Sequence, residues 1–153
     1  MEVLARYQVD YVLVGGLCAV LHGAPIVTMD MDIVHPRGPE NLARLSEALR
    51  GIGAHYRHQF GRRTEPGISH LDTPGHQLLQ TDIGPLDVLG TIGNGLDYDA
   101  LLPLSRAEDI EGMSIRLLDL EKLIEVKSAA NRDKDRAVLP ILRQTLAERD
   151  RKS

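Results

Sequence analysis

Between residues 11 and 34 the pattern of hydrophobic and polar positions changes its period repeatedly along the chain. Residues 11–14 (YVLV) are consecutive β-favouring residues, which is typical of a strand covered on both faces. Gly15 and Gly16 interrupt this run, and the apolar positions of residues 17–21 then indicate a short helix. Residues 29–34 (MDMDIV) alternate apolar and acidic positions, the period of a strand. The stretch therefore predicts strand, tight turn, helix and strand in succession.

The second predicted strand carries two carboxylates on one face. Asp30 and Asp32 are two residues apart, and this spacing places them about 7 Å apart at the backbone. Like charges on one face repel each other and resist burial unless cations neutralise them. Mg²⁺ suits a few carboxylates together with the phosphates of a substrate. Gly15 and Gly16 lack a Cβ atom, so the backbone there can turn sharply and approach a phosphate closely.

The rest of the chain predicts further helices and strands. Helical spacing recurs in residues 40–50, and again from residue 120 after Asp119, the expected N-cap. Because proline is tolerated in the first turn of a helix, Pro140 indicates a last helix that starts near residue 136 or else kinks. Strands are expected over residues 54–60, 68–72, 76–83 and 85–89, with two more around Glu111 and Gly112, and the turn at residues 73–75 predicts a hairpin between the second and third of them. These elements predict an α/β (α+β) fold, a mixed twisted β-sheet flanked by helices, in a single domain over residues 1–153.

Asp87 is the best candidate for a third carboxylate from a later strand. It alone breaks the apolar run of residues 85–89, so its side chain lies on the opposite face from Leu86 and Val88. Asp82 competes for this role, but it precedes a Gly-Pro turn, and turn formation explains it adequately. Arg62 and Arg63, in a polar loop, are either ordinary surface residues or contacts for a triphosphate or a nucleic acid.

The Gly pair followed by Asp30-Met31-Asp32 resembles the signature of the nucleotidyltransferase (polymerase-β-like) superfamily. The sequence of residues 9–34 is similar in particular to the sequences of small bacterial nucleotidyltransferases grouped with abortive-infection and toxin–antitoxin proteins. Residues 120–142 resemble the carboxy-terminal part of these proteins, where a Lys and an Arg-x-Lys-Asp cluster follow, here Lys127, Arg132, Lys134 and Asp135. In those relatives a basic residue often precedes the acidic pair, whereas this chain has Ile26 and Val27, so one expected substrate contact is missing.

The resemblance implies a metal-dependent enzyme that transfers a nucleoside monophosphate from a nucleoside triphosphate such as ATP and releases pyrophosphate. The acceptor would be a hydroxyl of tRNA, of a protein or of a small molecule such as an antibiotic, and the partner an antitoxin or a second copy of the chain. Asp30, Asp32 and Asp87 would hold two Mg²⁺ ions and carry the catalysis. Gly15, Gly16, Lys127 and Arg132 would contact the phosphates. For Lys127 the alternative is a side chain that merely extends along an apolar face, and for Asp135 a cap or an orienting contact to Arg132 or Lys127 is favoured.

The composition of the chain argues against several kinds of site and several classes of protein. Cys18 is the only cysteine, which excludes an intrachain disulfide and a cysteine-based zinc site, and the six His lack the spacing of a zinc motif. An aromatic content of 3% argues against a module that stacks single-stranded bases. The chain shows no signal peptide and no membrane-spanning run, so a cytoplasmic location without membrane contact is expected.

Charge is unevenly distributed along the chain. The net charge is −4, yet residues 127–153 contain eight Lys or Arg against four Asp or Glu. This basic end could attract phosphate-bearing partners, but a solvated helix face is the simpler explanation. Two alternatives to an enzyme therefore stay open: a non-catalytic nucleotide- or metal-binding partner protein that retains the fold, and a nucleic-acid-binding regulator.

Overall fold

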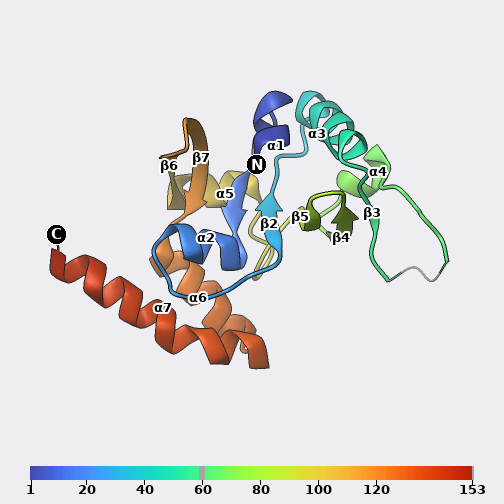
Figure 1. Cartoon of the computed structure of the whole chain (residues 1–153). Coiled ribbons are helices and arrows are strands. Elements are labelled where there is room, and N and C mark those ends of the chain that lie inside the picture. Colours follow the sequence, from blue (N-terminus) through green and yellow to red (C-terminus); the bar gives the residue numbers. More distant parts are fainter. Residues whose placement is uncertain (59–60, 153) are drawn as a thin grey trace.

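A computed structural model describes residues 1–58 and 61–152 of the chain. Within these residues seven strands form one sheet in the order β3-β4-β5-β2-β1-β7-β6 (Figure 1). Their bounds are β1 Val12–Val14, β2 Met31–Val34, β3 His55–Tyr56, β4 His76–Thr81, β5 Gly84–Leu89, β6 Ser105–Ile110 and β7 Met113–Leu118. The sheet is mixed: β1 is antiparallel to β2 and parallel to β7, β2 is parallel to β5, and the β3–β4, β4–β5 and β6–β7 pairs are antiparallel. The predicted mixed α/β architecture is confirmed.

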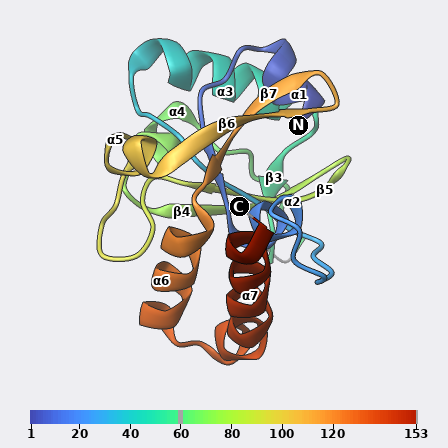
Figure 2. The same ribbon diagram turned by 90° about the vertical axis from the view of Figure 1, so that its left-hand side faces the viewer.

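Helices cover the sheet from two sides. Figures 1 and 2 show α1 (Glu2–Arg6) and α3 (Pro39–Gly51) on one side of the molecule, with α6 (Leu120–Ala130) and α7 (Asp133–Lys152) on the other. The helix α2 (Gly15–Leu21) follows β1 directly and contacts β1, β2 and α6. The shorter elements are α4 (Ile68–Leu71), α5 (Tyr98–Leu101) and a 3₁₀ turn (Leu102–Leu104). No helix in the described part of the chain is both long and apolar enough to cross a membrane.

The core extends over both faces of the central strands, and β1 is buried at every position, as predicted for a strand covered on both faces. The side chains of Leu13, Ile33, Leu79 and Val88 are fully buried, and they come from the four neighbouring strands β1, β2, β4 and β5. Helix α3 buries residues at helical spacing against this layer, including Leu45 and Leu49. On the opposite face of β2 and β5, Val34 and Leu89 are also buried, and Asp32 and Asp87 are the acidic positions of that face.

The predicted hairpin between residues 68–72 and 76–83 is wrong. Residues Ile68–Leu71 form the helix α4, and the hairpin joins β4 to β5 instead. The Thr81 hydroxyl stabilises that turn, because it donates to the carbonyl of Gly84 at 2.7 Å and accepts from the amide of Ile83 at 3.2 Å. Gly84 has φ +123°, which a residue without Cβ adopts readily.

Other element bounds also differ from the predictions: the strand expected over residues 29–34 begins at Met31, and the strand expected over 76–83 ends at Thr81. The edge strand predicted over residues 54–60 is reduced to His55–Tyr56, while Gln59 and Phe60 lie outside the described residues. The last helix begins at Asp133, before the predicted start near residue 136, so Pro140 lies inside it. The strands around Glu111 and Gly112 are confirmed as β6 and β7.

Candidate active site

Asp32 and Asp87 lie opposite each other on neighbouring parallel strands. The register of β2 and β5 pairs Asp32 with Asp87, next to the buried pair of Ile33 and Val88. Residues paired in register share a face of the sheet, so both carboxylates lie on the face opposite Ile33 and Val88. The structure therefore brings together two carboxylates that are 55 positions apart in the sequence, from 32 to 87.

The two carboxylates perturb each other. The pKa of Asp32 is raised to about 7, first by burial, then by the hydrogen bond and negative charge of Asp87 and by the charge of Asp30. The positive charge of Lys127 acts in the opposite direction. A carboxyl group whose pKa is raised by burial and by a second carboxylate is typical of functional sites.

Gly15 lets the backbone approach Asp32 closely. Its φ is +72°, and a Cβ atom built at this position would lie 2.0 Å from Oδ2 of Asp32. At Gly16 such an atom would lie 2.8 Å from the Thr28 hydroxyl. Gly15 therefore leaves room for a side chain of β2, and Gly16 for a side chain of the segment that leads into β2. The structure places the predicted Gly pair directly against the acidic strand.

Asp30 lies just before β2 rather than within it. Its main chain is held by Thr28, whose hydroxyl donates to the Asp30 carbonyl at 3.3 Å. Asp30 still contributes to the electrostatics of Asp32, as noted above. Within residues 1–58 and 61–152, no group of three or more His, Cys, Asp or Glu side chains is arranged to hold a metal ion by itself.

The donor set nevertheless suits one kind of metal. Two in-register carboxylates offer hard oxygen ligands, and burial together with the neighbouring negative charges raises the pKa of Asp32, which a bound cation would lower. Mg²⁺ is commonly bound by one or two carboxylates together with water and substrate phosphates, without a complete protein cage. The residues present fit Mg²⁺ in this sense.

Arg57 is a residue of this site that sequence reasoning missed. Its Nη2 lies 2.6 Å from Oδ1 of Asp87, and the side chains of Arg57 and Asp87 are only 17% and 15% exposed. Its Nη1 donates to the carbonyl of Leu79 at 2.7 Å, so the guanidinium is fixed between two partners. No sequence signal distinguished Arg57 from the other Arg residues nearby, because its contact depends on how β3 and β4 align beside β5.

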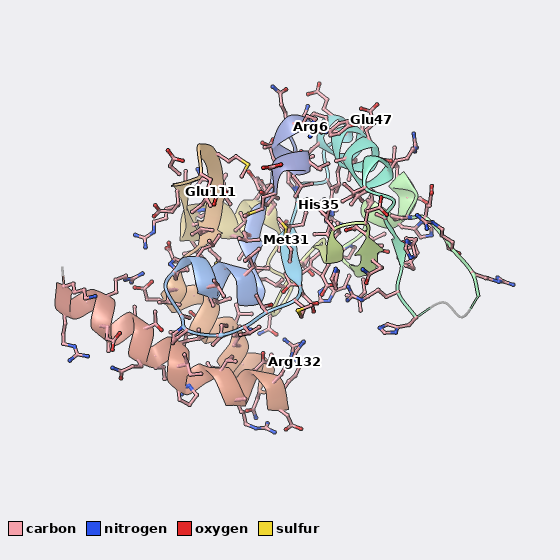
Figure 3. All side chains as sticks on the ribbon, in the orientation of Figure 1. Arg6, Met31, His35, Glu47, Glu111 and Arg132 are labelled. Atoms are coloured by element: carbon pink, nitrogen blue, oxygen red, sulfur yellow. The ribbon has the colours of Figure 1, made fainter. Side chains whose placement is uncertain are left out.

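The carboxy-terminal cluster forms around Asp135. This carboxylate is fully buried, accepts from Nε of Arg132 at 2.7 Å and from the Arg132 amide at 3.2 Å, and lies 3.6 Å from Nζ of Lys127. Burial alone would raise the pKa of Asp135, but the hydrogen bonds and charge of Arg132 and the charge of Lys127 lower it below its usual value. Figure 3 shows Arg132 among the carboxy-terminal helices and Met31 on β2. The expected contact of Asp135 with Arg132 and Lys127 is confirmed.

The competing candidate Asp82 is exposed in the turn between β4 and β5. Its carboxylate and the guanidinium of Arg63 both lie beside Gly53, and Arg63 donates to the carbonyl of Gly53 at 3.1 Å. Asp82 has no register partner in the sheet, whereas Asp87 faces Asp32. The structure therefore agrees with a turn role for Asp82.

Two solved structures share this architecture. A proposed nucleotidyltransferase (TM1012) from Thermotoga maritima matches 96% of this chain and 88% of its own, with 20% identity and a TM-score of 0.58. The lincosamide antibiotic adenylyltransferase LnuA, solved with lincomycin bound, matches 94% of this chain and 92% of its own, with 15% identity and a TM-score of 0.63.

The chain has a nucleotidyltransferase fold. No protein-family model and no curated protein matches the sequence. At such low identity the likeness establishes the fold, and the nucleotidyltransferase fold here includes strands β2 and β5 with their paired carboxylates.

Proposed function

We propose that this protein is a metal-dependent nucleotidyltransferase that moves a nucleoside monophosphate from a nucleoside triphosphate to a hydroxyl acceptor. The observation that carries the proposal is the register pair of Asp32 and Asp87, with the backbone of Gly15 against Asp32. The nucleotidyltransferase fold supports the same reaction class, and the adenylyltransferase LnuA favours ATP as the donor.

Asp30, Asp32 and Asp87 are the proposed ligands of Mg²⁺, with two ions expected. When bound, the metal supplies positive charge at the triphosphate and lowers the pKa of an acceptor hydroxyl. Arg57 holds Asp87 in one orientation through Oδ1. Gly15 and Gly16 give the phosphates access to the backbone beside Asp32.

Lys127 and Arg132 are the proposed phosphate contacts. Lys127 is 15% exposed, and its charge acts on both Asp32 and Asp135, so it sits between the acidic strand and the carboxy-terminal cluster. A lysine held there can place a point charge near a β- or γ-phosphate. Arg132 is 58% exposed and keeps part of its guanidinium available.

The proposed reaction exchanges one oxygen substituent of the α-phosphorus for another. The acceptor oxygen forms a bond to the α-phosphorus, the bond from that phosphorus to the bridging oxygen breaks, and pyrophosphate leaves. The hydroxyl proton passes to a carboxylate of the site. The protein contributes position and charge neutralisation and forms no covalent intermediate.

Label transfer from α-³²P-ATP in the presence of Mg²⁺ tests this proposal. Wild-type protein is expected to label an acceptor among tRNA, the protein itself and small hydroxyl compounds. Asp32→Asn and Asp87→Asn are expected to reduce the rate by roughly 100-fold or more, because each removes a charge that faces the metal. Asp82→Asn is the matched control and should retain the wild-type rate, since Asp82 is exposed in a turn.

Two results would contradict the proposal. Equal labelling by wild type and Asp32→Asn would show that the acidic pair does not carry the reaction. Binding of Mg·ATP without labelling of any acceptor would instead support the non-catalytic nucleotide-binding protein.

A further inference from the structure

A polar cavity of about 190 Å³ lies beside the residues that lead into β1, and β6, β7 and α5 complete its lining. Arg116 and Asp10 are the charged side chains of the described lining. Tyr11, Tyr98 and Ser114 add hydroxyl groups, and the two remaining lining residues are apolar. Sites for drug-sized ligands measure about 300–1,000 Å³, so a cavity of this size and lining suits a smaller, polar molecule.

Arg116 brings a positive charge to this cavity without a carboxylate partner. It belongs to β7, which lies between β1 and β6, and it is partly buried. Its Nη1 donates to the carbonyl of Ser105 at 3.4 Å and to the hydroxyl of the same residue at 3.3 Å. None of the described residues forms an ion pair with Arg116. A guanidinium carries five N–H donors, so most of them remain for a ligand with an anionic group.

Asp10 supplies the opposite charge, and helix α3 fixes its backbone. The Asp10 amide donates to Oδ1 of Asn41 at 2.7 Å, and Nδ2 of Asn41 donates to the Asp10 carbonyl at 3.2 Å. The Asp10 carboxylate is 3.8 Å from Nη2 of Arg44, with the two side chains 63% and 36% exposed, so this pair is weak. Asp10 and Arg116 form no ion pair with each other. The carboxylate therefore remains able to accept from a cationic group of a ligand.

Tyr98 lies close to both charges. The pKa of Tyr98 is raised above its usual value, first by burial and then by the negative charge of Asp10, while the positive charge of Arg116 acts in the opposite direction. Within the described part of the chain, the Tyr98 hydroxyl has no hydrogen-bond partner. Tyr98 is the first residue of α5, and the cap Asp97 fixes this turn by accepting from the amide of Ala100 at 2.9 Å. Its hydroxyl is thus a third polar group available at the same place.

The cavity and the acidic pair lie at opposite ends of β1. Val14, the last residue of this strand, is paired with Asp32, whereas the cavity is lined by residues 9–11, which precede the strand. Three steps separate Tyr11 from Val14, and at about 3.3 Å per step they span roughly 10 Å. A small ligand in the cavity therefore does not occupy the place of the phosphates at Asp32.

We propose that this cavity binds a free α-amino acid in its zwitterionic form, with the carboxylate at Arg116 and Tyr98 and the ammonium group at Asp10. A guanidinium binds a carboxylate through two parallel N–H donors, and the opposite charges of the lining match those of the ligand. Asp10 disfavours a pure anion such as phosphate, and Arg116 disfavours a metal cation. This inference does not depend on the proposed function, because the cavity lies apart from the acidic pair.

Ligand-observed NMR with each proteinogenic amino acid in turn tests the cavity. At least one of them is expected to bind the whole chain saturably, with a Kd of about 1 mM or below. Arg116→Gln and Asp10→Asn should each weaken this binding about tenfold or more, because each removes one of the two charges. Arg106→Gln is the matched control and should bind like wild type. Arg106 lies on the neighbouring strand β6, is 50% exposed, pairs with Glu108 and does not line the cavity.

Two derivatives of the amino acid that binds test the contacts separately. The methyl ester loses the negative charge and the N-acetyl compound loses the positive charge, so both should bind wild type more weakly than the parent. The penalty for the ester should shrink in Arg116→Gln, and the penalty for the N-acetyl compound should shrink in Asp10→Asn, since the matching charge is already absent. The derivatives are first compared on wild type, so this test does not require that a variant fold.

Four results would overturn the inference. Absence of saturable binding by every amino acid up to about 10 mM would remove the ligand. Equal affinity of the parent, the ester and the N-acetyl compound for wild type would remove the charge contacts. Binding unchanged by both Arg116→Gln and Asp10→Asn, or competition by Mg·ATP, would place the amino acid outside the cavity. Tighter binding of inorganic phosphate that is lost in Arg116→Gln would assign the cavity to simple anions.

Discussion

At the scale of single residues, the ion pair of Arg57 and Asp87 offsets part of the negative charge of the acidic site. Both side chains are less than one-fifth exposed, so neither is well solvated if its partner is removed. Arg57→Met is therefore expected to lower the free energy of unfolding by about 1–3 kcal/mol, measured by urea denaturation. Arg57→Lys should recover part of this loss, because it keeps the charge but not the bond geometry.

Arg44 supplies the control for this variant. Its pair with Asp10 spans 3.8 Å, and the two side chains are 36% and 63% exposed, so Arg44→Met should cost less than about 1 kcal/mol. If Arg57→Met were no more destabilising than Arg44→Met, the pair with Asp87 would not contribute to stability as proposed. In the background Asp87→Asn, the cost of Arg57→Met should fall, since the charged partner is absent.

A second residue-scale prediction concerns Gly15. Gly15→Ala would place a methyl group 2.0 Å from the Asp32 carboxylate, so Asp32 must move. Gly112 also has a positive φ, +85°, but a Cβ atom there would meet nothing within 4 Å. Gly112→Ala should therefore cost about 1 kcal/mol for backbone strain alone, and Gly15→Ala about 1–3 kcal/mol more. Thermal denaturation of the two variants measures the difference, and equal costs would show that the close approach to Asp32 is unimportant for stability.

At the scale of elements, Asp135 connects α6 to α7. It lies in the first turn of α7, accepts from Arg132 just before that helix and is 3.6 Å from Lys127 of α6. Asp135→Asn is expected to destabilise the protein by about 2–4 kcal/mol, because it leaves Lys127 without its buried counter-charge. Hydrogen exchange should increase in α7 more than in β1 or β2.

Asp133→Asn is the comparison for this helix junction. Asp133 also lies in the first turn of α7 and pairs with Arg136, but its side chain is 96% exposed. Its loss should cost less than about 1 kcal/mol, since solvent replaces the pair. A similar cost for both variants would point to the helix terminus, and not to the buried cluster, as the source of stability.

The sequence predicts an element correctly where its local pattern of apolar and polar residues is strong. The run from residue 11 to 34 combines four β-favouring residues, a Gly pair and strict alternation, and β1, α2 and β2 follow it closely. The short run of residues 68–72 has no such pattern, and a few apolar residues serve equally in a helical turn or a strand. The hairpin was therefore assigned to the wrong pair, although turn residues precede and follow β4.

The same distinction applies to the residues of the candidate site: some are identified by a local pattern and others are not. Asp87 could be selected by its type and its place in an apolar strand, and the register then places it opposite Asp32. Arg57 could not be selected, because its role depends on the alignment of an edge strand of two residues. The contact of Lys127 with Asp135 likewise depends on the packing of two helices. Long-range pairing, which no local pattern encodes, decides both cases.

At the scale of the whole molecule, the uneven charge distribution is partly neutralised by the fold. The basic end begins near the acidic pair, because the charge of Lys127 acts on Asp32. At the far end of α7, Arg149 pairs with Glu121 of α6 and with Asp150. Part of the net charge of +4 on residues 127–153 is therefore compensated by ion pairs within the protein. Less positive charge then remains for a phosphate-bearing partner.

The dependence of overall stability on pH follows from the same acidic pair. The pKa of Asp32 is about 7 in the folded protein against an ordinary value of 3.8, so the folded state binds more protons than the unfolded state between these values. The free energy of unfolding should therefore fall as the pH rises from about 4 to about 7. One pKa unit corresponds to about 1.4 kcal/mol, so the loss is of the order of a few kcal/mol. Urea denaturation in EDTA at successive pH values measures it.

Asp32→Asn isolates this contribution, because the amide does not titrate. The variant should lose less stability than wild type over the same pH range, whereas Asp82→Asn should follow wild type. Added Mg²⁺ should reduce the loss in wild type, since a bound cation favours the ionised carboxylate, and should have little effect on Asp32→Asn. Parallel curves for wild type and Asp32→Asn in EDTA would mean that Asp32 is ionised well below pH 7. The acidic pair would then already be neutralised by Arg57 and Lys127, and the electrostatic reason to expect a metal ion between β2 and β5 would be lost.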